Sequence, residues 1–207
     1  MRSCLSFFIG LLLLSGSATA QKKYDAKLVI FFKDTFNVSM TVNFNGTNPE
    51  LIEITEKIKS KGKKTTTQTE KINSATISCF FINGERYKFK DLKNGYEQKE
   101  IVRNCCVKRI AGTDTLGLFE FKDEKNISLF YIQTPADENL LYNIEHDYVT
   151  SSFKSFALMR FVKCKFLYDK ISNATPGYYY GEKDSVTSDR VAVWKKIIEG
   201  YYSNCAK

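Results

Sequence analysis

The 207-residue sequence has one histidine, three prolines and no cysteine pair spaced as C-x-x-C. His146 alone could serve a catalytic triad, but no G-x-S-x-G motif accompanies it, and the adjacent Glu145 and Asp147 do not converge with it on a metal ion. A glycine-rich phosphate loop is also missing. The 43% hydrophobic and 14% aromatic residues argue against disorder, collagen and coiled coil. These absences predict a globular protein without a cofactor, and they favour a role other than catalysis.

The first twenty residues have the features of an export signal. A positive charge precedes the short apolar run Leu5 to Leu14, and Ala18-Thr19-Ala20 forms a small-x-small cleavage site. We expect cleavage between Ala20 and Gln21 and a mature protein in the periplasm or outside the cell. The apolar run is about half the roughly 20 residues of a membrane-spanning helix. Cys4 precedes this run, whereas a lipid-modified cysteine follows it, so the sequence predicts neither a membrane span nor a lipid anchor.

An excess of positive charge limits the partners. The chain has 31 Lys and Arg against 23 Asp and Glu, for a net charge of +8. Its densest lysine group is followed by Thr65-Thr66-Thr67 and contains no aromatic residue, so we expect a solvated loop. Export removes nucleic acid as a partner, which leaves an envelope protein, a glycan or another anionic surface. The lysines of this group are Lys57, Lys59, Lys61, Lys63 and Lys64.

Residues 21–135 are expected to form a β-rich domain. Apolar and polar residues alternate from Asn37 to Phe44, and Asn83-Gly84 between two apolar runs is a strong hairpin signal, because a type I′ turn needs positive φ at both positions. The pattern predicts an antiparallel sheet curled into a barrel or sandwich. The expected strands are 26–33, 37–44, a short one at 51–54, 76–82, 85–90, 100–110, 116–122 and 127–133.

Residues 136–207 show helical spacing and are expected to pack on or beside the sheet. A first helix, capped by Ser151 or Ser152, carries apolar residues every three or four positions, and a second helix begins near Thr187. Residues 176–181 between them continue neither helix. The whole chain is therefore predicted to be α+β with a two-helix C-terminal segment. The two apolar stripes are Phe153, Ala157, Phe161, Cys164, Tyr168 and Ile171, and Val191, Trp194, Ile198, Tyr201 and Cys205.

Five cysteines remain after the expected cleavage, and an odd number leaves at least one thiol unpaired. Cys164 and Cys205 lie on the apolar stripes of the two helices, so antiparallel packing predicts a disulfide between them. Two buried free thiols are the alternative. Cys105 and Cys106 are neighbours in a strand and point to opposite sides of the sheet, so only one of them can face Cys79. The sequence leaves open which of the two would pair with it.

The layout of the chain resembles a known group of proteins. A signal peptide is followed by Tyr24-Asp25-Ala26-Lys27, then by an I-x-x-A-x-I strand at Ile72 to Ile77 that leads into Asn83-Gly84-Glu85-Arg86-Tyr87, and the helical tail ends with Ile197 to Cys205. This order resembles small exported proteins of unknown function from Gram-negative bacteria. The resemblance implies an exported protein of this layout and assigns no catalytic residue.

These features favour an exported, non-catalytic protein that binds or scaffolds a component of the bacterial envelope. One alternative is a carrier with an apolar ligand inside a barrel lined by aromatic rings. A second is a hydrolase, which predicts two carboxylates converging in a cleft. Tyr178-Tyr179-Tyr180 could form an aromatic platform for a sugar or a linker tucked against the helices. The rings expected to line the carrier are Phe44, Phe80, Phe119 and Phe130.

Overall fold

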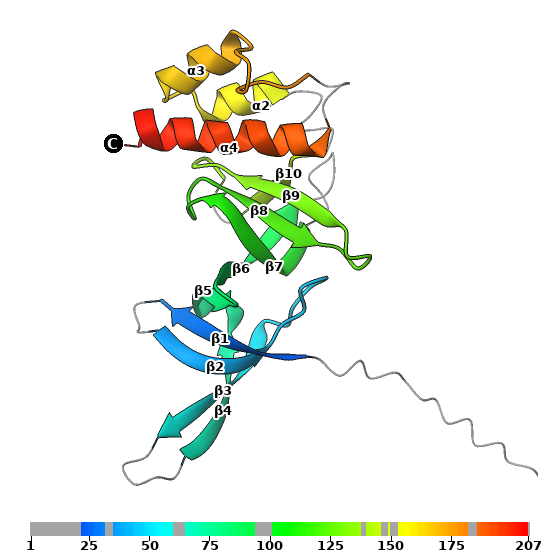
Figure 1. Cartoon of the computed structure of the whole chain (residues 1–207), viewed down its shortest axis with the longest axis vertical. Coiled ribbons are helices and arrows are strands. Elements are labelled where there is room, and N and C mark those ends of the chain that lie inside the picture. The colour runs from blue at the N-terminus through cyan, green and yellow to red at the C-terminus, as the bar shows by residue number, and fades with distance from the viewer. Residues whose placement is uncertain are drawn as a thin grey trace, which may run out of the picture.

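The computed structural model describes residues 22–31, 35–59, 65–93, 101–137, 140–145, 149, 153–181 and 186–206. In this part of the chain, ten strands form one sheet and three helices follow, which confirms the α+β prediction (Figure 1). The expected signal 1–20, His146 and the expected caps Ser151 and Ser152 lie outside the described residues. The elements are β1 (Lys23–Ile30), β2 (Thr35–Thr41), β3 (Leu51–Lys59), β4 (Thr65–Asn73), β5 (Ile77–Ile82), β6 (Glu85–Lys93), β7 (Ile101–Gly112), β8 (Gly117–Lys122), β9 (Ser128–Gln133), β10 (Leu140–Asn143), α2 (Phe153–Arg160), α3 (Lys165–Ser172) and α4 (Thr187–Asn204).

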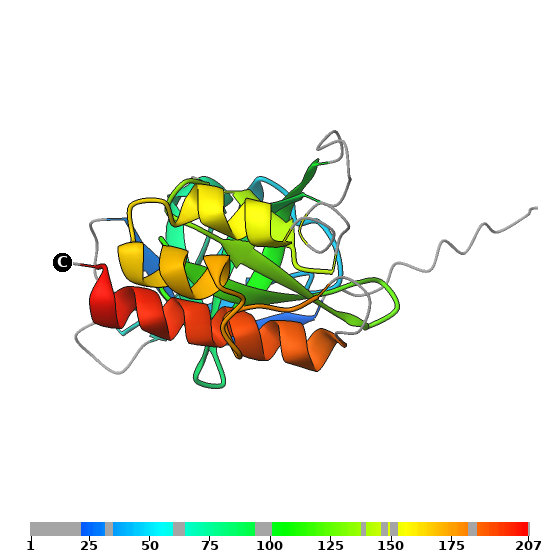
Figure 2. The ribbon, with the colours of Figure 1, turned by 90° about the horizontal axis from the view of Figure 1, so that it is seen from above.

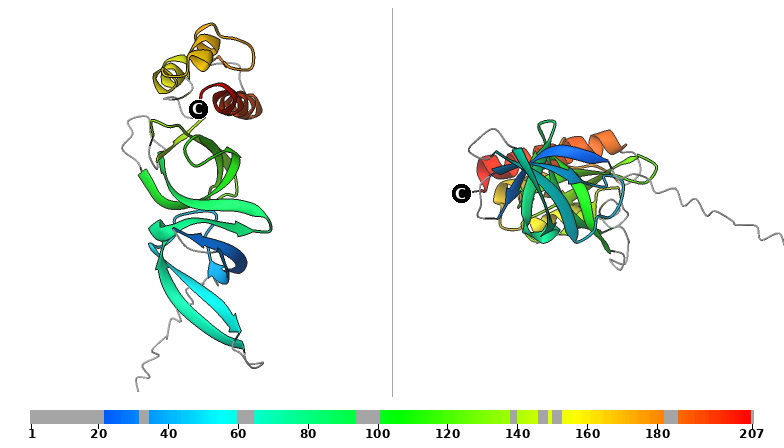
Figure 3. Two further views of the ribbon diagram at one scale, coloured as in Figure 1. Left: turned by 90° about the vertical axis from the view of Figure 1, so that its left-hand side faces the viewer. Right: turned by 90° about the horizontal axis from the view of Figure 1, so that it is seen from below.

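Strands β6 to β10 close into a barrel. Successive strands from β6 to β9 pair antiparallel, β10 pairs antiparallel with β9, and β10 then pairs in parallel with β6, where Leu141 lies opposite Leu92. The left view of Figure 3 shows this ring of strands. Side chains of Leu92, Val107, Phe119, Tyr131 and Leu141 are buried together inside it. The barrel is therefore a filled core, as expected for a small barrel.

The sheet continues beyond β6 in the order β5-β1-β2-β3-β4. One face of this N-terminal part is apolar and holds a second core, which includes Leu28, Met40, Ile54 and Phe80. Strand β2 pairs with β3 only over residues 38–40, so the outer part of the β3–β4 hairpin extends past β2 as a two-stranded ribbon (Figure 1).

The turn between β5 and β6 has the geometry that the sequence predicts. Asn83 and Gly84 have φ angles of 52° and 81°, as a type I′ turn requires. Phe80 lies opposite Tyr87 and their rings stack at 5.6 Å, on the apolar face of the hairpin. The turn thereby fixes the register that places β6 between the two halves of the sheet.

The prediction of a solvated loop around the lysine group is wrong where the structure describes it. Lys57 lies on β3, and Thr65, Thr66 and Thr67 begin β4, whereas Lys61, Lys63 and Lys64 fall outside the described residues. Threonine is β-branched and favours strands. Nearly every side chain of β4 is exposed, however, so the strand has no apolar alternation that would mark it in the sequence.

Helices α2, α3 and α4 lie at one end of the molecule beside the barrel (Figure 1), and in the view from above they lie over it (Figure 2). Their apolar side chains form a third core with the outer face of the barrel, in which Phe156, Phe161 and Trp194 pack near Leu118 and Ile132. The first predicted helix is two helices in the structure, α2 and α3, separated by residues 161–164. None of the helices in the described part of the chain is long and apolar enough to cross a membrane.

Candidate functional site

The candidate site is a pocket of about 440 Å³ where the N-terminal sheet meets the outer face of the barrel. We call it the Tyr24 pocket. Its volume lies within the range of small-molecule sites. Strands β1, β5, β6, β7 and β8 and three connecting segments contribute to it. The lining residues are Tyr24, Phe44, Asn45, Ile82, Asn83, Glu85, Tyr87, Cys106, Lys108, Glu120, Lys122 and Asn126.

One wall of the Tyr24 pocket is aromatic. The rings of Tyr24 and Phe44 meet edge to face at 5.1 Å, and Phe44 meets Tyr87 at the same distance. The Tyr87 ring also stacks on Phe80. At the other end of the wall, the Lys22 ammonium lies 5.3 Å from the Tyr24 ring centroid. Edge-to-face packing fixes the rings at steep mutual angles. This wall therefore offers rigid apolar surface to a ligand.

The adjoining wall of the pocket carries charges of both signs. In the register of β6, β7 and β8, Lys108 lies between Tyr87 and Glu120. The Lys108 ammonium donates to one Glu85 oxygen, and the Tyr87 hydroxyl donates to the other at 2.7 Å. With Lys122, the pocket has two carboxylates and two ammonium groups, so its formal charge is balanced.

These hydrogen bonds shift the pKa values of Glu85 and Tyr87. The hydrogen bonds from Lys108 and then from Tyr87 lower the pKa of Glu85, which is therefore an ionised acceptor at neutral pH. Burial and the bond to Glu85 raise the pKa of Tyr87, so its hydroxyl stays neutral and acts as a donor. Glu120 accepts a hydrogen bond from the Ser128 hydroxyl. The arrangement is suited to hydrogen bonding with a polar ligand.

Two carboxylates, Glu85 and Glu120, line the same pocket, which is the feature expected of the hydrolase alternative. Glycoside hydrolysis needs one of its two carboxyl groups to be protonated, so that it can donate a proton to the leaving group. The pKa of Glu85 is shifted in the opposite direction by Lys108. Glu85 is therefore unsuited to the role of the general acid.

The cysteines of the sheet are free thiols. Cys79 lies on β5, Cys105 and Cys106 lie on β7, and β6 runs between these strands. No bridge therefore joins Cys79 to either of them. Two strand spacings amount to roughly 9–10 Å, beyond the about 7 Å limit for Cα atoms of a disulfide. Cys105 packs inside the barrel and Cys106 in the N-terminal core, so they do point to opposite sides. Burial raises the pKa of Cys105 to about 12 and that of Cys106 as well, which keeps both thiols unreactive.

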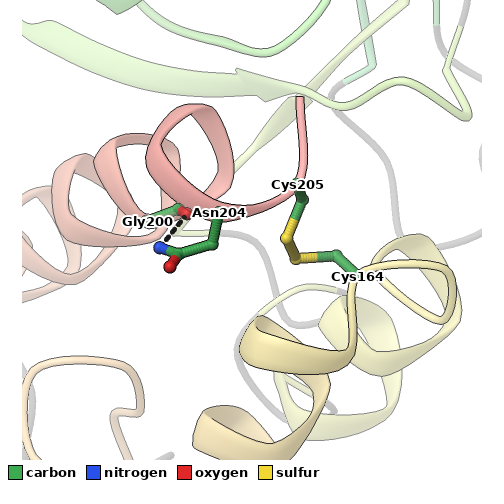
Figure 4. Close-up of a disulfide and its surroundings, with 4 residues drawn as sticks. All are labelled: Cys164, Gly200, Asn204 and Cys205. Atoms are coloured by element: carbon green, nitrogen blue, oxygen red, sulfur yellow. Dashed lines mark hydrogen bonds between the residues drawn. A yellow bond between two sulfur atoms is a disulfide. The ribbon is translucent and has the colours of Figure 1, made fainter. Parts of the chain in front are cut away.

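The predicted disulfide between Cys164 and Cys205 is present (Figure 4). Cys164 directly precedes α3, and Cys205 directly follows α4. Their Cα atoms are 5.4 Å apart, a normal separation for a disulfide. Next to the bridge, the Asn204 amide donates to the Gly200 carbonyl at 2.8 Å and closes the last turn of α4. The bridge fastens the end of α4 to the start of α3.

The tyrosines of residues 178–180 form a tucked linker. Tyr180 is buried, and its ring centroid lies 4.1 Å from that of Phe153. The Trp194 indole donates a hydrogen bond to the Tyr180 hydroxyl at 3.2 Å. Tyr178 packs edge to face on Phe166. Tyr180 is thereby fixed in the helical core, whereas Tyr178 and Tyr179 are half-buried and do not form a flat exposed platform with it.

The four rings expected to line a carrier cavity do not meet. Phe44 and Phe80 belong to the N-terminal core, Phe119 lies inside the barrel, and Phe130 packs with the helices. Phe44 reaches the Tyr24 pocket, whose lining also carries Glu85, Lys108, Glu120 and Lys122. The expected common apolar lining is therefore wrong.

Sequence reasoning missed the charged wall of the pocket. Glu85, Lys108 and Glu120 come from three strands, and the register of these strands brings them together. A cross-strand alignment of opposite charges on the polar face could have suggested the cluster. Such an alignment requires the strand order, which the sequence does not contain.

Comparisons with protein families, curated proteins and solved structures find no match to this chain. The resemblance to exported proteins of unknown function therefore rests on the sequence layout alone.

Proposed function

We propose that this chain is an exported, non-catalytic binding protein of the bacterial envelope, and that the Tyr24 pocket holds one pyranose unit of a glycan. The observation that carries this proposal is an aromatic cluster beside a charge-balanced cluster in the lining of one pocket of about 440 Å³. A pyranose has an apolar ring face, which packs on aromatic surface, and hydroxyls, which both donate and accept hydrogen bonds. Glu85 supplies an acceptor, and Lys108 supplies a donor.

Titration followed by backbone amide shifts in NMR tests the pocket. Methyl β-glucopyranoside and the corresponding N-acetylglucosaminide are suitable probes, because they carry a single neutral ring. We expect saturable shifts at Tyr24, Tyr87 and Lys108 with at least one probe. Tyr24→Ala removes a ring from the wall and should weaken binding by about tenfold.

Tyr168→Ala is the matched control, because this exposed tyrosine lies on α3, away from the pocket. It should leave the affinity unchanged. Equal weakening by both variants, or shifts confined to the helices, would contradict the assignment of the pocket. Release of nitrophenol from an aryl glycoside, lost in Glu120→Gln, would show an enzyme instead.

Export is the other part of the proposal, and residues 1–20 and the Cys164–Cys205 disulfide support it, since disulfides persist in oxidising compartments. Mass spectrometry of the protein from an export-competent bacterial host should give a chain that begins at Gln21. Retention of Met1, or a lipid on Cys4, would overturn it.

A further inference from the structure

The N-terminal sheet has a second recess on the face opposite its apolar core. A groove of about 980 Å³ runs over β5, β1, β2 and β3 on this outer face. Residues of the outer face have odd numbers in these strands, whereas the buried core residues Ala26, Leu28, Val38 and Met40 have even numbers. We call this polar surface of the N-terminal sheet the outer face; it is distinct from the outer side of the barrel. The side chains in its groove are Asp25, Lys27, Thr35, Asn37, Ser39, Thr55, Lys57 and Phe81.

The outer face is organised in rows that cross the strands. Asp25 lies opposite Ser39, which lies opposite Thr55, and Thr55 lies opposite Thr69 on β4. The hydroxyls of Thr55 and Thr69 are 3.2 Å apart. The row therefore presents small hydroxyl side chains on three neighbouring strands, β2, β3 and β4, beside Asp25 on β1. Such small side chains leave room for an extended chain close to the backbone.

A second row carries the positive charge. Phe81 lies opposite Lys27, which lies opposite Asn37, and in the adjoining ribbon Lys57 lies opposite Thr67. Lys27 and Lys57 have exposed side chains that line the groove. The spacing of β1 and β3 puts their attachment points about 10 Å apart, on either side of β2. Two exposed cations along one groove suit a ligand with repeated negative groups.

The described charges of the outer face are mostly basic. It carries the lysines 23, 27, 57 and 71 against Asp25 and Glu53, a net charge of +4 − 2 = +2. Lys23 pairs with Glu53 at 3.3 Å. Among the residues that the structure describes, Lys27 and Lys57 are thus the cations that line the groove, and Asp25 is the one carboxylate.

We propose that the outer face binds an extended acidic polysaccharide, which lies across β5, β1, β2 and β3 with its carboxylates near Lys27 and Lys57. The hydroxyl and amide side chains of the two rows hydrogen-bond the sugar hydroxyls, and Phe81 supports one ring. This site is separate from the Tyr24 pocket, which lies on the other side of the sheet and carries no net charge; only Asn83 in the turn lines both.

The chemistry of the face distinguishes a polysaccharide from a nucleic acid. Single-stranded nucleic acids bind on several aromatic side chains that stack with successive bases. The groove is lined by one aromatic ring, Phe81, among its described side chains. Its Ser, Thr and Asn side chains are matched instead to a ligand rich in hydroxyls.

Calorimetric titration with a linear oligogalacturonate long enough to span the face tests the proposal. We expect binding that weakens as salt is raised, and no binding of a malto-oligosaccharide of equal length, because ion pairing contributes most of the affinity. The double variant Lys27→Gln/Lys57→Gln should bind at least about tenfold more weakly.

Lys165→Gln/Lys195→Gln is the matched control, since it removes two exposed lysines from α3 and α4 and changes the net charge equally. It should bind as the wild type does. Equal losses in both double variants, absence of binding, or tighter binding of an oligothymidylate would overturn the proposal. Tyr24→Ala should leave this binding intact, so the outer face and the Tyr24 pocket are tested independently.

Discussion

Replacement of Cys164 by serine is expected to lower the free energy of unfolding by about 4 kcal/mol. The disulfide to Cys205 closes a loop of 41 positions, and the loop-closure entropy of an unfolded chain of that length gives this magnitude. The melting temperature should fall by roughly 10 °C for a chain of this size. Urea unfolding of the wild type and of Cys164→Ser, both without reductant, measures the difference.

The helices explain why this loss is large for the C-terminal segment. Helices α2 and α3 have eight residues each, which is too short for a stable isolated helix. Cys205→Ser and the double serine variant should match Cys164→Ser, because each removes the same bridge. Wild type treated with reductant should unfold like the variants; an unchanged midpoint after reduction would contradict the prediction.

Local signals in the sequence predicted those parts of the fold that depend on neighbouring residues. The Asn83-Gly84 turn is specified by two residues with positive φ. Helix α4 begins at Thr187, as the spacing of its apolar residues indicates, and buries Trp194 and Ile198. The pairing of Cys164 with Cys205 follows from two apolar stripes that pack together.

Features set by distant contacts were not predictable in this way. Closure of the barrel depends on the parallel pairing of β10 with β6, between residues about 50 positions apart. Strand β10 itself has four residues and lies after Pro135, where the sequence turns to helical spacing. The break between α2 and α3 carries no glycine or proline, and it places Phe161 and Cys164 both in the helical core.

The candidate sites also combine features that neighbouring residues determine with features that distant contacts determine. Alternation predicted which residues of a strand share a face, so the polar outer side of residues 37–43 was readable from the sequence. The rows of the outer face need the order and register of β1 to β5, and the charged wall of the Tyr24 pocket needs those of β6, β7 and β8. A shift of one residue in register would move every side chain to the other face.

A buried ion pair connects the helices to the barrel. Asp137 lies in the connection between β9 and β10, and Arg160 ends α2. The Arg160 Nε and Nη2 donate to the two carboxylate oxygens of Asp137 at 2.8 and 2.9 Å, and the Thr134 hydroxyl donates to Asp137 as well. The side chains of Arg160 and Asp137 are only 9% and 6% exposed, respectively. The guanidinium also lies 3.6 Å from the Phe156 ring centroid and 4.8 Å from that of Tyr142.

Asp137→Asn is expected to lower the free energy of unfolding by about 3–5 kcal/mol, because it leaves the Arg160 guanidinium buried without its counter-charge. Urea unfolding measures this loss, with Lys23→Ala as the control: it breaks the exposed pair with Glu53 and should cost less than about 1 kcal/mol. Asp137→Leu combined with Arg160→Met removes both charges and should recover much of the stability. Equal losses in Asp137→Asn and Lys23→Ala would mean that the buried pair does not hold the helices to the barrel.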